Sequence, residues 1–164
     1  MEKDIKLNIV DRDYFYFLDK EGHLWHEGTE IIDPQFLFTI FRSLQKTSDG
    51  KFLTKCQGEN CFVETEDVPY IVQDIAFHKD SKGNLQQADL LFSGGFMEIL
   101  DPKTLFVSSS NVLYCRVRKG EFLARFTRKA YFQLTPFLHE ERRDHYYLAM
   151  KGEHFPITEQ APSV

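Results

Sequence analysis

The feature that most constrains the fold is a motif that occurs twice in the chain. Residues 30–37 read Glu-Ile-Ile-Asp-Pro-Gln-Phe-Leu and residues 98–105 read Glu-Ile-Leu-Asp-Pro-Lys-Thr-Leu, so five of the eight positions are identical. Farther along, Gly58-Glu59 matches Gly120-Glu121. Asp-Pro is a common helix start, so one match alone could be chance. Because the matches follow the same order of predicted elements, we interpret them as an internal duplication.

The duplication predicts an α+β fold made of two similar repeats, residues 1–84 and 85–164. Each repeat would be a curved antiparallel sheet with one helix, and the second repeat would be mostly β. Alternating apolar residues and turn residues predict strands at residues 14–18, 23–32, 51–55, 61–65, 70–77, 88–93, 96–100, 112–117, 121–128, 130–138 and 146–150. Between them we expect a polar lead-in at 1–12, a polar loop at 78–87, a charged turn at 139–144 and a loose tail from residue 158.

A helix is predicted to begin at Asp33-Pro34 and to end near Lys46. An aspartate can accept the free N–H groups at the start of a helix, and proline fits the first helical position. The apolar side chains that follow are spaced as one stripe of a helix and are expected to be buried against a sheet: Phe36, Leu37, Ile40, Phe41 and Leu44.

Composition limits the class of protein. With 20 basic and 25 acidic residues the chain carries a net charge of −5, whereas nucleic-acid-binding chains are normally basic, so we expect no nucleic-acid partner. The N-terminal residues have no apolar core of a signal peptide, and no stretch is long enough to span a membrane. Three cysteines do not form a complete disulfide framework. We therefore expect a cytoplasmic protein.

Several segments resemble a bacterial family of uncharacterised proteins, the DUF1285 family. They are Gly22 to Gly28, Phe41 to Leu44 followed by Asp49-Gly50, Val63 to Tyr70, and Ala124 to Phe126 followed by Arg128 and Tyr131. The resemblance implies a duplicated core whose second half is similar to a pleckstrin-homology-like sheet. It also implies a small-ligand site between the halves, for a nucleotide-like molecule, and a role in signalling.

Charge is distributed unevenly between equivalent hairpins. Residues 54–68 carry one basic and four acidic side chains, whereas residues 116–130 carry six basic and one acidic. The basic hairpin could be a solvated edge, could pair with the acidic hairpin, or could bind an anion such as phosphate. Strand alternation makes Arg128 and Glu66 a candidate ion pair between the repeats.

We therefore predict a non-enzymatic binding module with a cleft between the halves. Arginines would hold an anionic small molecule, and Trp25 or Tyr131 would stack on a ring, although for Trp25 alone packing in the core is favoured, because aromatic side chains are mostly core residues. The predicted ligand-binding residues are Trp25, His26, Glu66, Asp67, Arg116, Arg118, Arg125, Arg128 and Tyr131. The alternatives are a protein–protein adaptor without a small ligand, and a small enzyme acting on a phosphorylated substrate with His26 or Asp67 as general base.

No nucleophile elbow, P-loop or dinucleotide motif is present, so we expect no cofactor and assign no catalytic residue. His23 and His26 would lie on opposite faces of a strand, which is poor spacing for a metal. Cys56 and Cys61 flank a four-residue turn and could approach each other, but we expect them to remain reduced thiols.

Overall fold

The computed structural model describes residues 12–163. The predicted polar lead-in therefore lies outside the described residues, apart from Arg12. No helix among the described residues is long and apolar enough to cross a membrane.

The first half of the chain forms a six-stranded sheet with one helix against it. Its elements, in chain order, are β1 (Asp13–Leu18), β2 (Leu24–His26), β3 (Thr29–Glu30), α1 (Pro34–Ser43), β4 (Gln45–Lys46), β5 (Phe52–Cys56) and β6 (Glu59–Thr65). The strand order is β3-β2-β1-β6-β5-β4. All neighbours are antiparallel except β1 and β6, which are parallel.

The second half repeats this order of strands. Its elements are β7 (Tyr70–Val72), β8 (Asp74–Lys79), β9 (Leu85–Leu91), the 3-10 turn η1 (Ser93–Gly95), β10 (Met97–Ile99), the 3-10 turn η2 (Pro102–Thr104), β11 (Phe106–Val107), β12 (Leu113–Val117) and β13 (Phe122–Phe126). If β7 and β8 are taken as one bent strand, the order is β10-β9-β8/β7-β13-β12-β11. Among these strands the parallel pair, β7 with β13, corresponds to β1 with β6.

The backbone hydrogen bonds fix this correspondence to single residues. The carbonyl of Leu18 accepts a bond from Glu66 N at 2.9 Å, and the carbonyl of Val72 accepts one from Thr127 N at 3.0 Å. Leu18 and Val72 therefore hold equivalent places, and the second copy begins at β7 rather than at residue 85. The division into two separate domains stays a prediction.

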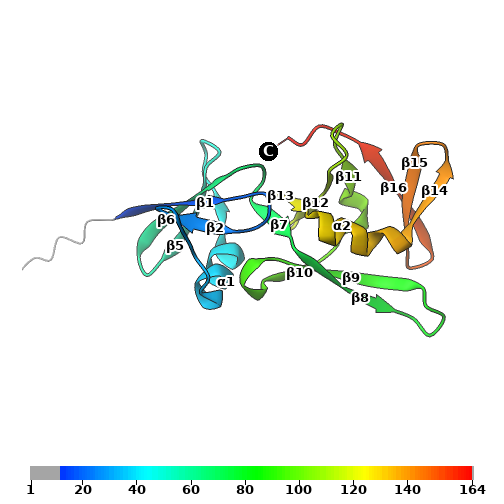
Figure 1. The fold of residues 1–164 in the computed structure, drawn as a ribbon, viewed down its shortest axis with the longest axis horizontal. Helices are drawn as coiled ribbons and strands as arrows, with labels where there is room; N and C mark the ends of the chain where they lie inside the picture. The colour runs from blue at the N-terminus through cyan, green and yellow to red at the C-terminus, as the bar shows by residue number, and fades with distance from the viewer. Residues whose placement is uncertain (1–11, 164) are drawn as a thin grey trace, which may run out of the picture.

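The chain then continues beyond the second copy. The added elements are α2 (Arg128–Leu134), the 3-10 turn η3 (Thr135–Phe137), β14 (Leu138–Arg142), β15 (His145–Met150) and β16 (Glu153–Glu159). Strand β16 pairs in parallel with β11, so the second sheet grows to seven strands in the order β14-β15-β16-β11-β12-β13-β7. Figure 1 shows an elongated molecule with the six-stranded sheet at one end and β14 and β15 at the other.

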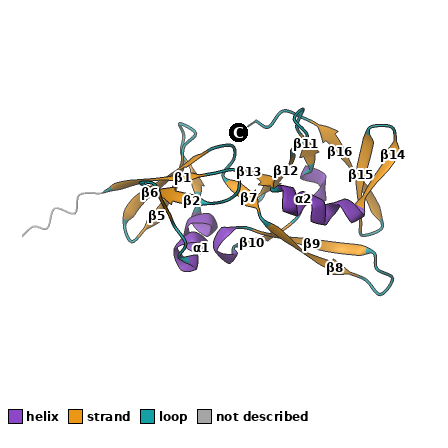
Figure 2. Cartoon of the chain, viewed as in Figure 1, coloured by secondary structure: helices purple, strands orange, loops and turns teal. Residues whose placement is uncertain are grey.

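Both copies of the repeated motif begin a helical turn, as predicted. The carboxylate of Asp33 accepts a bond from Gln35 N at 3.0 Å, and that of Asp101 accepts one from Lys103 N at 3.1 Å. The first copy continues as a ten-residue helix, whereas the second stops after three residues. The α+β class with curved sheets is confirmed, and Figure 2 shows the helices as minor parts of a molecule made mainly of strands.

Helix α1 contributes to a core shared by both copies. Within the predicted apolar stripe of α1, Ile40, Phe41 and Leu44 are fully buried. Phe36 and Leu37 are half-buried. Phe41 packs against Tyr70 of the second copy, whose hydroxyl donates to the Phe41 carbonyl at 2.6 Å. Gly94 of η1 touches the backbone of α1 so closely that an added Cβ would clash with Phe38.

Three local predictions are wrong, and a fourth is wrong in part. Residues 130–138 form α2 and η3 instead of a strand, because the Thr127 side chain caps the helix by accepting from Ala130 N at 3.2 Å. Residues 78–87 are mostly the arms of the β8–β9 hairpin, whose polar side chains face solvent. The charged turn contains most of β14, which pairs with β15, and the end of β16, which pairs with β11, extends two residues into the predicted tail, to Glu159.

Candidate functional site

Arg118, at the tip of the basic hairpin, is bound to the end of α1. Its Nη1 donates to the carbonyls of Phe41 and Leu44 at 3.3 and 3.2 Å and to the Tyr70 hydroxyl at 2.8 Å. Carbonyls at a helix C-terminus have no partner within the helix, and the helix dipole favours a cation there. The Arg118 backbone N–H donates to Glu98 at 2.7 Å. Arg118 therefore joins the two copies of the fold.

A second polar contact between the copies centres on Asp67. Its Oδ2 accepts from Arg125 Nη1 at 2.9 Å and from the Tyr114 hydroxyl at 2.7 Å. The Arg125 and Asp67 side chains are 22% and 24% exposed, so solvent screens this pair only in part. Burial and the bond to Asp67 raise the pKa of Tyr114 to about 12, so Tyr114 donates this bond at neutral pH.

The acidic and basic hairpins are thus joined by an ion pair, but the predicted partners are wrong. Glu66 accepts from Lys20 N at 2.8 Å, and Arg128 lies over the ring of Phe132 at 5.4 Å. The reason is that Arg128 is the first residue of α2 and not the end of a strand.

The other predicted residues make separate contacts. Arg116 is half-buried and donates to the Gly120 carbonyl at 3.4 Å, and Tyr131 is half-buried on α2. Trp25 donates to Asp19 at 3.0 Å, and His26 is bonded to the Phe15 carbonyl at 3.0 Å.

Trp25 and His26 lie on opposite faces of the first sheet. Leu24, next to them, is buried with Leu18 on the face toward α1. His26 shares that face and packs on Tyr16 with ring centroids 4.7 Å apart, whereas Trp25 lies on the other face. The contacts of these two residues are therefore within the first sheet, while those of Arg118 and Arg125 join the copies.

A hollow of about 450 Å³ lies between the start of α1 and the inner face of the first sheet. Tyr14, Phe36, Cys56 and Cys61 line it. Burial raises the pKa of the Cys61 thiol to about 12, so this group is a poor nucleophile at neutral pH. All three cysteines are free, and no group of three potential metal ligands occurs among the described residues.

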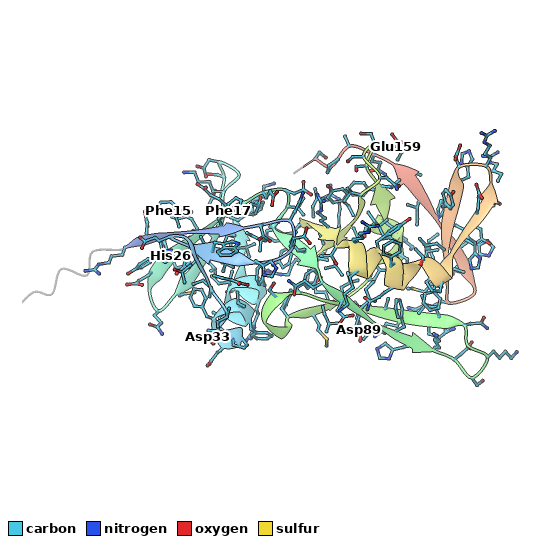
Figure 3. The ribbon with its side chains drawn as sticks, in the orientation of Figure 1. Phe15, Phe17, His26, Asp33, Asp89 and Glu159 are labelled. Atoms are coloured by element: carbon cyan, nitrogen blue, oxygen red, sulfur yellow. The ribbon has the colours of Figure 1, made fainter. Side chains whose placement is uncertain are left out.

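The outer face of the first sheet is an exposed aromatic surface that the sequence analysis did not identify. Phe15 is 59% exposed and Phe17 is 42% exposed. Phe15 stacks on its neighbour Phe62 with centroids 5.5 Å apart, and Figure 3 labels Phe15 and Phe17 along β1. The register places Trp25 beside Phe17 and Leu53 beside Phe62. We call Trp25, Phe17, Phe15, Phe62 and Leu53 the aromatic face.

Acidic side chains predominate at the border of the aromatic face. Alternation along the strands places four carboxylates and two ammonium groups on this side of the sheet: Asp13, Glu30, Glu64, Glu66, Lys51 and Lys55. A hollow of about 420 Å³ lies over Phe15, Phe62, Lys51 and Glu64. The face thus combines aromatic rings with a mainly negative rim.

The second copy covers the equivalent surface. Since Leu18 corresponds to Val72, Phe17 corresponds to Ile71, and the registers then make Phe62 equivalent to Leu123. Ile71 and Leu123 are each only 3% exposed. Ser163, near the C-terminus, lines a small hollow together with Leu123, and Figure 1 shows the C-terminal segment returning toward β13.

Comparison with known proteins identifies the fold. No family model matches the chain. A DUF1285 family protein from Silicibacter pomeroyi DSS-3 is similar in structure, with a TM-score of 0.66 and 17% sequence identity over 90% of this chain and 81% of that one. A DUF1285 family protein from Shewanella baltica OS155 matches with a TM-score of 0.56 and 17% identity, over 75% of this chain and 91% of the other. The chain therefore has the fold of the DUF1285 family proteins, which confirms at the level of the fold the resemblance found in the sequence.

Proposed function

We propose that this protein is a non-catalytic adaptor that binds another protein through the aromatic face. The observation that carries the proposal is the contrast between equivalent residues of the two copies: Ile71 is 3% exposed, whereas Phe17 is 42% exposed and Phe15, on the same face of β1, is 59% exposed. Exposed clusters of large apolar side chains on a soluble protein commonly mark interaction sites. An adaptor also fits the signalling role that the family resemblance implies.

The surface chemistry defines the partner. Aromatic rings at the centre favour apolar or aromatic side chains, because burying one such ring contributes about 1.5–3 kcal/mol. The rim, where carboxylates outnumber ammonium groups, favours lysine or arginine at the border of the partner's contact segment. A guanidinium can also lie over an exposed ring such as Phe15. The partner is therefore a protein segment that presents an apolar side chain with a cation next to it.

A small anionic ligand between the halves has less support. Of the four predicted arginines, Arg118 is bonded to the end of α1 and Arg125 is paired with Asp67. An anion would have to displace these contacts and leave a carboxylate and helix carbonyls without partners. If Arg118 and Arg125 keep their contacts, only Arg116 and Arg128 of the four predicted arginines remain to hold an anion.

The test uses a fluorescein-labelled ten-residue peptide in which lysine alternates with phenylalanine or valine. We expect saturable binding to the wild-type protein, followed by fluorescence anisotropy. The double variant Phe15→Ser/Phe17→Ser should bind at least about ten-fold more weakly, because two exposed rings are lost from the contact. A peptide with glutamate in place of lysine should bind less well to the wild type.

The matched control is Met97→Ser/Ile99→Ser. These residues are 52% and 62% exposed and alternate along β10 as the two phenylalanines do along β1. This control should bind the peptide as the wild type does, and both double variants should melt close to the wild-type temperature. Equal peptide binding by the wild type and the Phe15→Ser/Phe17→Ser variant would contradict the proposal.

A further inference from the structure

We infer that one partner of the aromatic face is a second copy of this chain, which docks through a basic patch at the start of α2. The patch consists of Arg128, Lys129 and Phe132. This inference rests on the proposed function, because it names the occupant of the same face.

The patch has the chemistry that the face requires. Phe132 is 54% exposed, and the guanidinium of Arg128 lies 5.4 Å from the centre of its ring. Arg128 and Lys129 are themselves exposed. The patch therefore presents one aromatic ring with cations directly beside it.

The charges of the patch are unfavourable within their own helix. Arg128 and Lys129 are the first two residues of α2, and no acidic residue lies in its first turn. The N-terminal end of a helix carries partial positive charge, so cations there are disfavoured. Lys129 is compensated by Asp74 at 3.2 Å, but among the ion pairs of residues 12–163 Arg128 has none. A residue that breaks a local rule without local compensation is a candidate for an intermolecular role.

The two surfaces are complementary in charge and shape. Glu64 is exposed and lies beside Phe17 in the register of β1 and β6. The hollow of about 420 Å³ next to it is floored by Phe15 and Phe62. Phe132 of one molecule can enter this hollow and pack on the rings, while Arg128 pairs with Glu64 at its edge.

The same two surfaces lie in different halves of the molecule. Figure 1 shows α2 in the half opposite to β1 and β6. A single contact between the face of one copy and the patch of another leaves one patch and one face of the pair unoccupied. These two surfaces can contact each other in a closed two-fold dimer, or can contact further copies in rings or open chains.

The experiment uses two variants that each keep one surface: the face variant Phe15→Ser/Phe17→Ser and the patch variant Arg128→Ser/Phe132→Ser. Sedimentation velocity is measured at protein concentrations from about 1 to about 100 µM, the range in which weakly associating proteins form complexes. We expect the wild type to associate increasingly with concentration and each variant alone to remain monomeric. An equimolar mixture of the two variants should form a dimer and nothing larger, because only one face and one patch remain intact. Added salt should weaken that dimer.

A wild type that stays monomeric to about 100 µM, a mixture that does not dimerise, or a patch variant that associates like the wild type would each overturn the inference. The peptide assay separates this failure from that of the proposed function. In one outcome, the wild type binds the peptide and stays monomeric, and the face variant does not bind the peptide. That outcome would leave the adaptor function intact and exclude the second copy as the partner. Dimerisation of the mixture without peptide binding would support the second copy and refute the general requirement for a basic apolar segment.

Discussion

Removal of the Arg118 side chain should destabilise the protein without any ligand present. Its single Nη1 atom lies within hydrogen-bond distance of two carbonyls at the end of α1 and of the Tyr70 hydroxyl. A net hydrogen bond to a charged group contributes about 1.5–3 kcal/mol, and a cation at a helix C-terminus adds about 0.3–1 kcal/mol. Since one nitrogen cannot donate fully to three acceptors, we expect Arg118→Ala to lower the free energy of unfolding by about 2–4 kcal/mol.

The backbone at this residue allows the side-chain contribution to be separated from strain. Arg118 has φ of +53°, a left-handed conformation that costs a residue with a Cβ roughly 1 kcal/mol and costs glycine little. Arg118→Gly should therefore be less destabilising than Arg118→Ala by about 1 kcal/mol. The control is Lys119→Gly, at φ of +59° with an exposed side chain, which should stabilise the protein slightly.

The assay is urea unfolding at neutral pH, followed by tryptophan fluorescence and far-UV circular dichroism. An Arg118→Gly variant at least as stable as the wild type would refute the argument, because relief of strain would then be the whole effect. That result would also mean that the Arg118 side chain is not needed for stability and is available to hold an anion.

Three further predictions concern the core and the charges. Phe41 is 1% exposed, so Phe41→Ala should cost about 3–5 kcal/mol in urea unfolding, and a loss near zero would mean that the ring is not packed. In a double-mutant cycle, Asp67→Asn and Arg125→Gln should show a coupling energy of about 0.5–3 kcal/mol, whereas additive losses would exclude a direct interaction. The hydrogen bond from Gln133 holds the pKa of Asp74 below its usual value, so its carboxylate stabilises the fold at neutral pH and this contribution disappears as the pH falls through the lowered pKa. Asp74→Asn should therefore destabilise the protein most at about pH 7 and progressively less as the pH is lowered through the carboxylate range, and a loss that does not change with pH would contradict this assignment.

The elements that could be predicted are those whose signals are local. Asp33 and Asp101 accept bonds from N–H groups two residues ahead, and proline follows each of them, so the start of both helical turns is encoded in three residues. The burial of Ile40, Phe41 and Leu44 likewise follows from spacing on one helix.

The elements that were missed depend on contacts between distant parts of the chain. Helix α2 has only seven residues and begins with two cations, and its Tyr131 and Phe132 favour a strand by propensity. Its helical state depends on the Thr127 cap and on burial of Ala130 and Leu134. Strand β16 contains a proline, and it pairs in parallel with β11. No local sequence pattern predicts that pairing.

The charge contrast between the hairpins was a correct signal with the wrong partners. Glu66 and Asp67 are adjacent in sequence. Which of the two carboxylates contacts the second sheet depends on the path of the chain between β6 and β7. Asp67 pairs with Arg125, while Glu66 accepts from a backbone N–H in the β1–β2 turn. The sequence could therefore indicate that the copies are linked by charge, but it could not assign the pair.

The aromatic face has a signal in the sequence that becomes meaningful only with the fold. Residues 14–17 are four aromatic residues in a row, and alternation requires that two of them point away from the core. Whether those two are covered depends on what packs on the outer side of the sheet. In the second copy, Ile71, the equivalent of Phe17, is only 3% exposed, and so is Leu123, the equivalent of Phe62. The first copy leaves Phe15 and Phe17 exposed, so the asymmetry between the copies, and not the aromatic run itself, is what identifies this surface as the place to look for a partner.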